Sequence, residues 1–181
     1  MVMANNYTPE AIAKIRAFVF DVDGVMTDGG ILGTETGELY RVYDAKDGFA
    51  LRMASMHGYK MGIITGGRSE SILKRGLKIG FEAEDIYLHS RNKIDDFNDF
   101  CKRHELKSEE VMYFGDDIPD LCVMEVCGIS ACPCDAVEDV KKTADFVSTY
   151  PGGKCFVRNA VETIMKIHGT WVMDAEGYKR F

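Results

Sequence analysis

A short apolar run that ends in two carboxylates constrains the fold of this chain more than any other feature. Residues 18–20 are apolar, and Asp21, Asp23 and Gly24 follow at once. Apolar runs bounded by turn residues are typical of buried strands, and ligands of α/β proteins bind where such strands end. Because two neighbouring carboxylates repel each other, they need a cation or a shared proton. The run therefore predicts a buried strand that places two acidic groups at the rim of a sheet. It also predicts that these groups bind a hard metal ion there.

Strand-like and helix-like segments alternate along most of the 181 residues. Strands are expected at 17–20, 59–64, 86–88, 111–114, 128–131 and 145–147, and helices at 8–15, 47–57, 69–79, 93–104, 118–126, 137–142 and 154–167. This order predicts an α/β fold, a doubly wound parallel sheet with right-handed crossovers. We expect one domain with a substantial core. It would carry a β-hairpin at 29–44 that projects from the sheet, and a C-terminal tail at 168–181 that either frays or serves as a lid.

Composition narrows the classes of function. The formal net charge of −7 argues against general nucleic-acid binding, which needs a basic surface. The six cysteines lack the usual zinc spacing, so reduced, unpaired thiols are expected. No signal-peptide pattern and no long apolar span is visible in the sequence, so we expect a cytoplasmic enzyme with no membrane partner.

Reactive groups follow four of the predicted strands. Asp21 and Asp23 follow the first, Thr65 with Gly66 and Gly67 the second, Lys93 the third, and an acidic cluster of Asp116, Asp117 and Asp120 the fourth. Each signal alone has a simpler explanation, such as a turn, a solvated lysine or a helix cap. In a parallel sheet all four lie on one edge, and turns and caps do not readily explain that convergence.

The combined side chains suit phosphoryl transfer. An aspartate can attack phosphorus, and Mg²⁺ can bridge carboxylate and phosphate oxygens. A hydroxyl, glycine N–H groups and a lysine can hold the remaining phosphate oxygens. A second carboxyl group can protonate the leaving oxygen and later deprotonate water.

The order of these motifs resembles that of the haloacid dehalogenase superfamily of phosphatases over nearly the whole chain. The resemblance implies that Asp21 is the nucleophile, that Asp23 is the general acid and base, and that Thr65 and Lys93 hold the phosphoryl group. It also implies that Mg²⁺ is bound by Asp21, Asp23 and Asp116, with Asp117 and Asp120 supporting the site.

Most members of that superfamily carry a cap domain, whereas only the 29–44 hairpin follows the first motif here. The segments 21–29, 46–48 and 151–154 resemble the capless 3-deoxy-D-manno-octulosonate 8-phosphate phosphatases, which are homotetramers of lipopolysaccharide precursor synthesis. By this resemblance a neighbouring subunit helps to close each site. The implied contacts to the sugar acid phosphate are Asp23, Asp44, Ala45, Lys46, Asp47, Gly48, Arg52, Gly66, Arg75 and Lys93.

Two departures from the family pattern affect the sugar pocket rather than the carboxylates. The family usually has arginine directly after Thr-Gly, where this chain has Gly67, and Gln-Gly before the lysine, where it has His89 and Ser90. A phosphatase for a nine-carbon keto-deoxy sugar acid therefore stays open as an alternative. A non-catalytic oligomerisation module of a sugar-nucleotide synthase is a second alternative, and a phosphomutase is disfavoured because no cap would exclude water.

Overall fold

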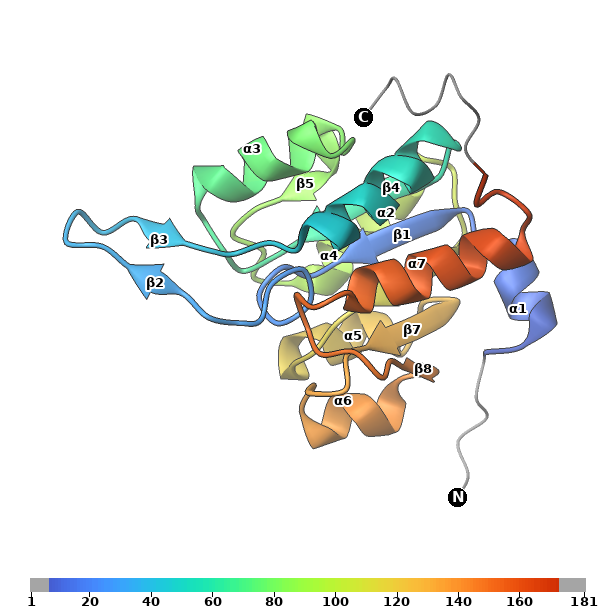
Figure 1. Ribbon diagram of the computed structural model, residues 1–181. Helices are drawn as coiled ribbons and strands as arrows, with labels where there is room; N and C mark the ends of the chain where they lie inside the picture. The colour runs from blue at the N-terminus through green and yellow to red at the C-terminus, as the bar shows by residue number, and fades with distance from the viewer. Residues whose placement is uncertain (1–6, 173–181) are drawn as a thin grey trace.

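A computed structural model describes residues 7–172 of the chain, and a six-stranded parallel sheet forms its centre. The strand order is β5-β4-β1-β6-β7-β8 (Figure 1). The strands are β1 (Ala17–Phe20), β4 (Lys60–Ile64), β5 (Ile86–Tyr87), β6 (Val111–Phe114), β7 (Ile129–Cys132) and β8 (Phe146–Val147). The predicted doubly wound sheet is confirmed, and all six predicted strands are present within two residues of their expected bounds.

Helices cover both faces of this sheet (Figure 1). One face carries α1 (Pro9–Lys14), α2 (Ala45–Met56), α3 (Glu70–Lys78) and α7 (Phe156–Ile167), and the other carries α4 (Lys93–Arg103), α5 (Leu121–Met124) and α6 (Glu138–Thr143). Among the helices of residues 7–172, none has both the length and the apolar character needed to cross a bilayer.

The central strand β1 divides the core between the two faces. Phe18 and Phe20 pack with α2 and α7 on one side, whereas Ala17 and Val19 pack with α4 and α5 on the other. All four side chains are fully buried, as expected for a parallel strand covered on both faces. Each buried phenylalanine contributes about 1.5–3 kcal/mol, so the strand that precedes Asp21 is firmly anchored.

Residues 29–44, which we call the arm, leave the body as an antiparallel pair of short strands (Figure 1). These are β2 (Leu32–Gly33) and β3 (Leu39–Tyr40). Gly37 takes a φ of +83° in the turn between them, a conformation that glycine adopts without a steric penalty. The predicted projecting hairpin is confirmed, although its paired part is only two residues long on each side.

The helix expected at 118–126 is wrong in its first turn. A 3₁₀ segment, η3 (Ile118–Asp120), precedes the four-residue α5. The Asp120 carboxylate accepts hydrogen bonds from the N–H groups of Asp116 and Asp117 at 3.0 and 3.3 Å. These bonds form a tight turn after β6, and they point the Asp120 side chain toward the site described below.

Only the first residues of the predicted tail lie within the described part of the chain. Trp171 packs against Phe49 of α2, with ring centroids 6.1 Å apart, and the Arg158 guanidinium lies 5.2 Å from its ring centroid. The other residues of the proposed lid, 173–181, lie outside the described residues. The described start of the tail is therefore attached to α2 and α7.

Candidate active site

The four predicted strand ends converge on one cavity of about 450 Å³ at the carboxyl edge of the sheet. Its walls include Asp21 and Asp23 after β1, Thr65 after β4, Lys93 at the start of α4 and Asp116 after β6. Gly66, Asp117 and Asp120 line the same cavity. Residues far apart in the sequence thus meet because parallel strands bring their carboxyl ends to one edge.

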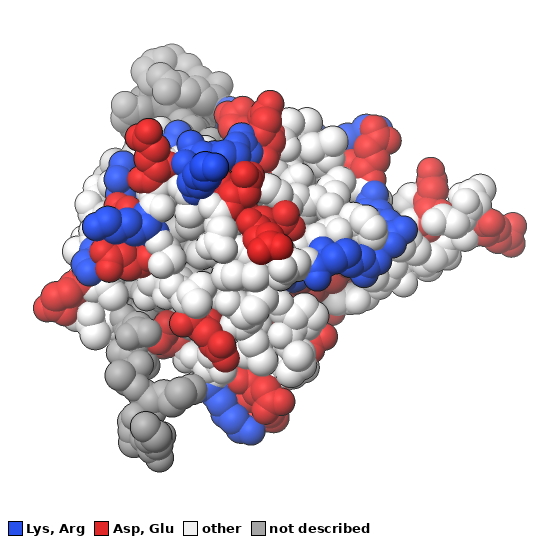
Figure 2. Space-filling view, turned by 180° about the vertical axis from the view of Figure 1, so that it is seen from behind, with Lys and Arg blue, Asp and Glu red and all other residues white. Residues whose placement is uncertain are grey.

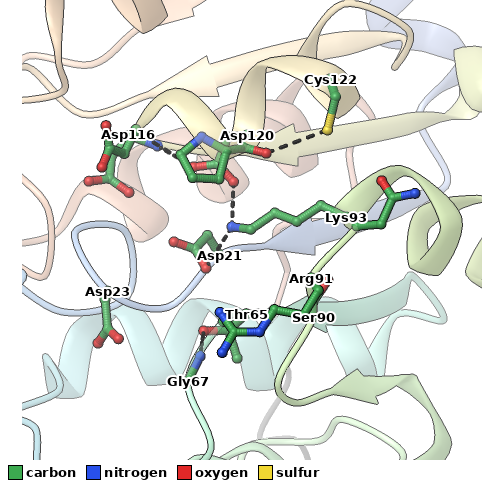
Figure 3. A pocket seen from close by; sticks show the side chains of 14 residues that line it. Asp21, Asp23, Thr65, Gly67, Ser90, Arg91, Lys93, Asp116, Asp120 and Cys122 are labelled. Atoms are coloured by element: carbon green, nitrogen blue, oxygen red, sulfur yellow. Dashed lines mark hydrogen bonds and ion pairs between the residues drawn. The ribbon is translucent and has the colours of Figure 1, made fainter.

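Lys93 links two of the acidic groups (Figure 3). Its Nζ lies 3.0 Å from Asp21 Oδ1 and 2.7 Å from Asp120 Oδ1. Burial alone would lower the pKa of Lys93, but the charges of Asp21 and Asp120 outweigh it and raise that pKa. The lysine is therefore a fixed cation beside the oxygen atoms of Asp21.

Asp120 has more hydrogen-bond partners than the other carboxylates of the site. Besides Lys93 and two backbone N–H groups, it accepts a hydrogen bond from the buried Tyr113 hydroxyl at 2.7 Å. Its oxygens are thus largely committed to protein donors. Tyr113 was not singled out from the sequence, since nothing in the apolar strand pattern marks a hydroxyl that points at the site.

The pKa values of Asp21 and Asp116 are both raised. Burial, followed by the neighbouring Asp120 charge, raises the pKa of Asp21 to about 7. Burial and the charge of Asp21 raise the pKa of Asp116 to about 8. Asp116 Oδ1 is buried without a hydrogen-bond partner. One oxygen from each of Asp21, Asp116 and Asp120 lies within 4.8 Å of the others. Since the Asp120 oxygens already accept hydrogen bonds, Asp21 and Asp116 are the groups of this cluster that fit a hard divalent cation, which would relieve the crowding of negative charge.

Gly24 allows Asp116 to approach the loop that follows β1. The glycine has a φ of +90°, and a Cβ placed on it would collide with the Asp116 carboxylate. A side chain is therefore excluded here on both steric and conformational grounds. This explains why glycine follows the second aspartate of the motif.

Asp23 lies in the cavity but is turned away from Asp21 (Figure 3). Both of its oxygens are held by Arg41 of the arm, at 2.6 Å to Nε and 2.9 Å to Nη2. Arg41 was missed by the sequence analysis, because an arginine in a projecting hairpin carries no sign of which body residue it reaches. Arg91, directly before the predicted Asn92 and Lys93 helix start, also lines the cavity.

The predicted phosphate-binding turn is compact. Thr65 is buried, and its Oγ1 accepts a hydrogen bond from the Gly67 N–H at 3.1 Å. The Ser90 N–H donates to the Thr65 carbonyl at 2.9 Å, which ties this turn to the segment before Lys93. The hydroxyl and the glycine N–H groups consequently border one end of the cavity.

The predicted sugar contacts on α2 and α3 lie outside this cavity. Ala45, Gly48, Arg52 and Arg75 line a separate cavity of about 360 Å³, and Lys46 lines another beside α7. Asp44 caps α2 by accepting from the N–H groups of Lys46 and Asp47, at 2.6 and 3.3 Å. Asp47 is buried and accepts from the Arg158 N–H at 2.8 Å. Within one chain, these residues and the carboxylate cavity are separate.

Comparisons with known proteins agree with this fold. A model of the haloacid dehalogenase-like hydrolases matches residues 68–151. Over 173 residues, the chain is 32% identical to the 3-deoxy-D-manno-octulosonate 8-phosphate phosphatase of Escherichia coli (strain K12), covering 92% of this chain and 91% of that protein. The chain therefore belongs to the haloacid dehalogenase-like hydrolases, and it is a phosphoric monoester hydrolase of that family.

Solved structures place it near one group of these phosphatases. The 3-deoxy-D-manno-octulosonate 8-phosphate phosphatase of Yersinia pestis superposes with a TM-score of 0.86 at 28% identity, covering 90% of this chain and 86% of that one. The Moraxella catarrhalis phosphatase of the same name, solved with a magnesium ion, a phosphate ion and a KDO molecule, gives 0.84 at 26% identity, with coverage of 88% and 90%.

Proposed function

We propose that the protein is a Mg²⁺-dependent phosphatase that hydrolyses 3-deoxy-D-manno-octulosonate 8-phosphate to KDO and phosphate, in lipopolysaccharide precursor synthesis. The observation that carries the proposal is the arrangement of charge at the strand ends. Lys93 is held between Asp21 and Asp120, Asp116 lies in the same acidic cluster, and one of its buried oxygens has no hydrogen-bond partner. A site retired to a purely structural role would have no need of this costly arrangement.

In the proposed mechanism the chain's own residues divide the work. The Asp21 carboxylate attacks phosphorus and forms an aspartyl-phosphate, while Asp23 protonates the leaving oxygen and then removes a proton from water. Thr65, Gly66 and Lys93 hold the phosphoryl oxygens. Asp21, Asp116 and the Asp23 backbone carbonyl would hold Mg²⁺, and the bound ion would offset the negative charge of the site.

The choice of substrate is supported by the relatives. The Escherichia coli and Moraxella catarrhalis proteins carry the octulosonate phosphatase name, and the latter was solved with KDO and phosphate. The residues expected to hold the sugar acid, from Asp44 to Gly48 with Arg52 and Arg75, lie apart from the cavity in one chain. In a homotetramer, the sugar-binding residues of one chain could lie beside the carboxylate cavity of its neighbour. This would explain why the two sets of residues are separate within one chain.

Replacing the nucleophile tests the reaction. We expect Asp21→Asn to lower kcat by at least about 10³-fold, because the amide cannot form the covalent intermediate. Asp139→Asn, which changes an exposed carboxylate on α6, serves as the matched control and should keep wild-type kcat. Turnover by Asp21→Asn within 10-fold of the wild type would contradict the mechanism.

A side-by-side turnover measurement tests the substrate. The eight-carbon and nine-carbon keto-deoxy sugar acid phosphates would be compared with and without Mg²⁺, and we expect a higher kcat/KM for the eight-carbon ester. A preference for the nine-carbon ester would change the substrate and leave the mechanism intact. No turnover of either ester by folded protein would instead favour the oligomerisation module.

A further inference from the structure

Arg41 is the one arm residue whose side chain is tied into the site by hydrogen bonds among the described residues. Its Nε and Nη2 donate to the two oxygens of Asp23 at 2.6 and 2.9 Å. Only 2% of the Arg41 side-chain surface is exposed, against 28% for Asp23. This two-pronged geometry is the strong form of an arginine–carboxylate pair. The arm is thereby connected to the carboxyl group to which we assign proton transfer.

The same Nη2 of Arg41 that donates to Asp23 also borders the phosphate-binding turn. A Cβ placed on Gly67 would lie 3.3 Å from Arg41 Nη2 and 3.3 Å from Thr65 Oγ1. The space beside this glycine is therefore bounded by a guanidinium and a hydroxyl, both donors that suit a phosphate oxygen. Since Gly67 and Thr65 line the main cavity, Arg41 lies within reach of an anion bound there.

The two hydrogen bonds from Arg41 to Asp23 are not compatible with the proton transfers expected of Asp23. Both oxygens are engaged by Arg41, and the carboxylate points away from Asp21 (Figure 3). Before the first step the Asp23 carboxylate must leave Arg41 and take up a proton from solvent, and it passes this proton to the leaving oxygen as the P–O bond breaks and the bond from Asp21 to phosphorus forms. In the second, Asp23 takes a proton from the water whose oxygen displaces Asp21 from phosphorus. At least one Asp23 oxygen must be released from Arg41 for either transfer.

We propose that Arg41 is a substrate-binding residue that exchanges Asp23 for the phosphoryl group of the substrate. The incoming phosphoryl dianion competes with the Asp23 carboxylate for the guanidinium. Each of these anions can accept two parallel N–H bonds from an arginine. Asp23 is released for proton transfer only when substrate occupies the site. This inference rests on the proposed role of Asp23 as acid and base.

A double-mutant cycle on phosphate binding tests the exchange. The dissociation constant of inorganic phosphate for the Mg²⁺-loaded protein would be measured by calorimetry for the wild type, Asp23→Asn, Arg41→Gln and the double variant. We expect Arg41→Gln to weaken phosphate binding roughly 10-fold. Asp23→Asn should tighten it by about 3- to 5-fold, since the competitor for Arg41 loses its charge. In the Arg41→Gln background this tightening should disappear.

Kinetics separate this role from simple positioning. Arg41→Gln should raise KM about 10-fold and leave kcat within about 3-fold, with Arg41→Lys between it and the wild type, because lysine keeps the charge without the fork. Arg16→Gln is the matched control. It breaks the 3.2 Å pair with Glu110 before the start of β1, at the opposite edge of the sheet, and should leave both constants unchanged.

The outcomes distinguish the exchange from the function on which it rests. Equal tightening by Asp23→Asn in both backgrounds, or a loss of kcat at unchanged KM in Arg41→Gln, would overturn the exchange. Asp23→Asn with wild-type kcat would overturn the acid and base role of Asp23, and with it the proposed mechanism, whatever the binding cycle shows.

Discussion

At the scale of single residues, hydrogen bonding sorts five carboxylates that the sequence presents as similar. Asp120 is saturated by Lys93, Tyr113 and two N–H groups, so it acts as part of the scaffold. Asp23 is held by Arg41. Asp116 keeps a buried oxygen with no hydrogen-bond partner. A buried polar atom without a partner is costly, and among these groups Asp116 is accordingly the one whose environment most calls for a cation.

Metal removal should therefore act through Asp116. Because Mg²⁺ would bind the folded chain and not the unfolded one, we expect saturating Mg²⁺ to raise the unfolding temperature of the wild type by about 5 °C. EDTA should abolish the rise, and Asp116→Asn should show no rise at any Mg²⁺ concentration. Thermal denaturation followed by circular dichroism measures this, with Asp139→Asn as the variant that responds like the wild type. A full Mg²⁺ response in Asp116→Asn would exclude it as a ligand.

At the scale of elements, the apolar strands were the most predictable part. The predicted bounds of β1 and β6 agree with the structure because each is a continuous buried run ended by aspartate or glycine. The convergence of Asp21, Thr65, Lys93 and Asp116 followed from the parallel order of the strands. The parallel order of the strands does not show which way each side chain points. The contacts of Arg41 and Tyr113 depend on the path of the arm and on the 3₁₀ turn, which neither periodicity nor spacing encodes.

The junction of α2 and α7 shows the same limit and leads to a pH prediction. Asp47 is 3% exposed, one oxygen accepts from the Arg158 N–H near the start of α7, and the other has no hydrogen-bond partner. Burial raises the pKa of Asp47 to about 6. The folded chain thus keeps a proton that the unfolded chain releases near pH 4. Asp47 therefore lowers the free energy of unfolding as the pH rises from about 4 to 6.

Asp47→Asn should remove that contribution. We expect the free energy of unfolding of the variant, minus that of the wild type, to increase by roughly 2–3 kcal/mol between pH 4 and pH 7. Most of the increase should occur below pH 6. Guanidinium denaturation at a series of pH values, in EDTA so that metal binding does not contribute, gives the difference directly. Parallel curves for the two proteins would show that the pKa of Asp47 is the same in the folded and the unfolded chain, and would contradict the prediction.

At the scale of the whole molecule, the arm and the body have different surfaces. Figure 2 shows acidic and basic side chains interspersed over the rear of the body, while much of the arm carries neither. Large apolar side chains are exposed along the arm, namely Ile31, Leu32, Leu39, Tyr40 and Val42. A cluster of this kind on a projecting element is typical of a surface that other copies cover. It is consistent with the proposed tetramer, in which neighbours would help to close a site that lacks a cap.

Two substitutions on the arm test that assembly. Leu32 and Val42 are 67% and 72% exposed, so changing both to serine should leave the fold of one chain intact, with its circular dichroism unchanged. If arms pack together, removing this apolar area should shift the protein from tetramer to monomer, as measured by light scattering. Because substrate closure would then be lost, kcat/KM should fall at least about 10-fold. Val126→Ser, at a 46% exposed position on the body, should change neither. A monomeric wild type would contradict the assembly, whereas a monomeric double variant with full activity would show that one chain closes its own site.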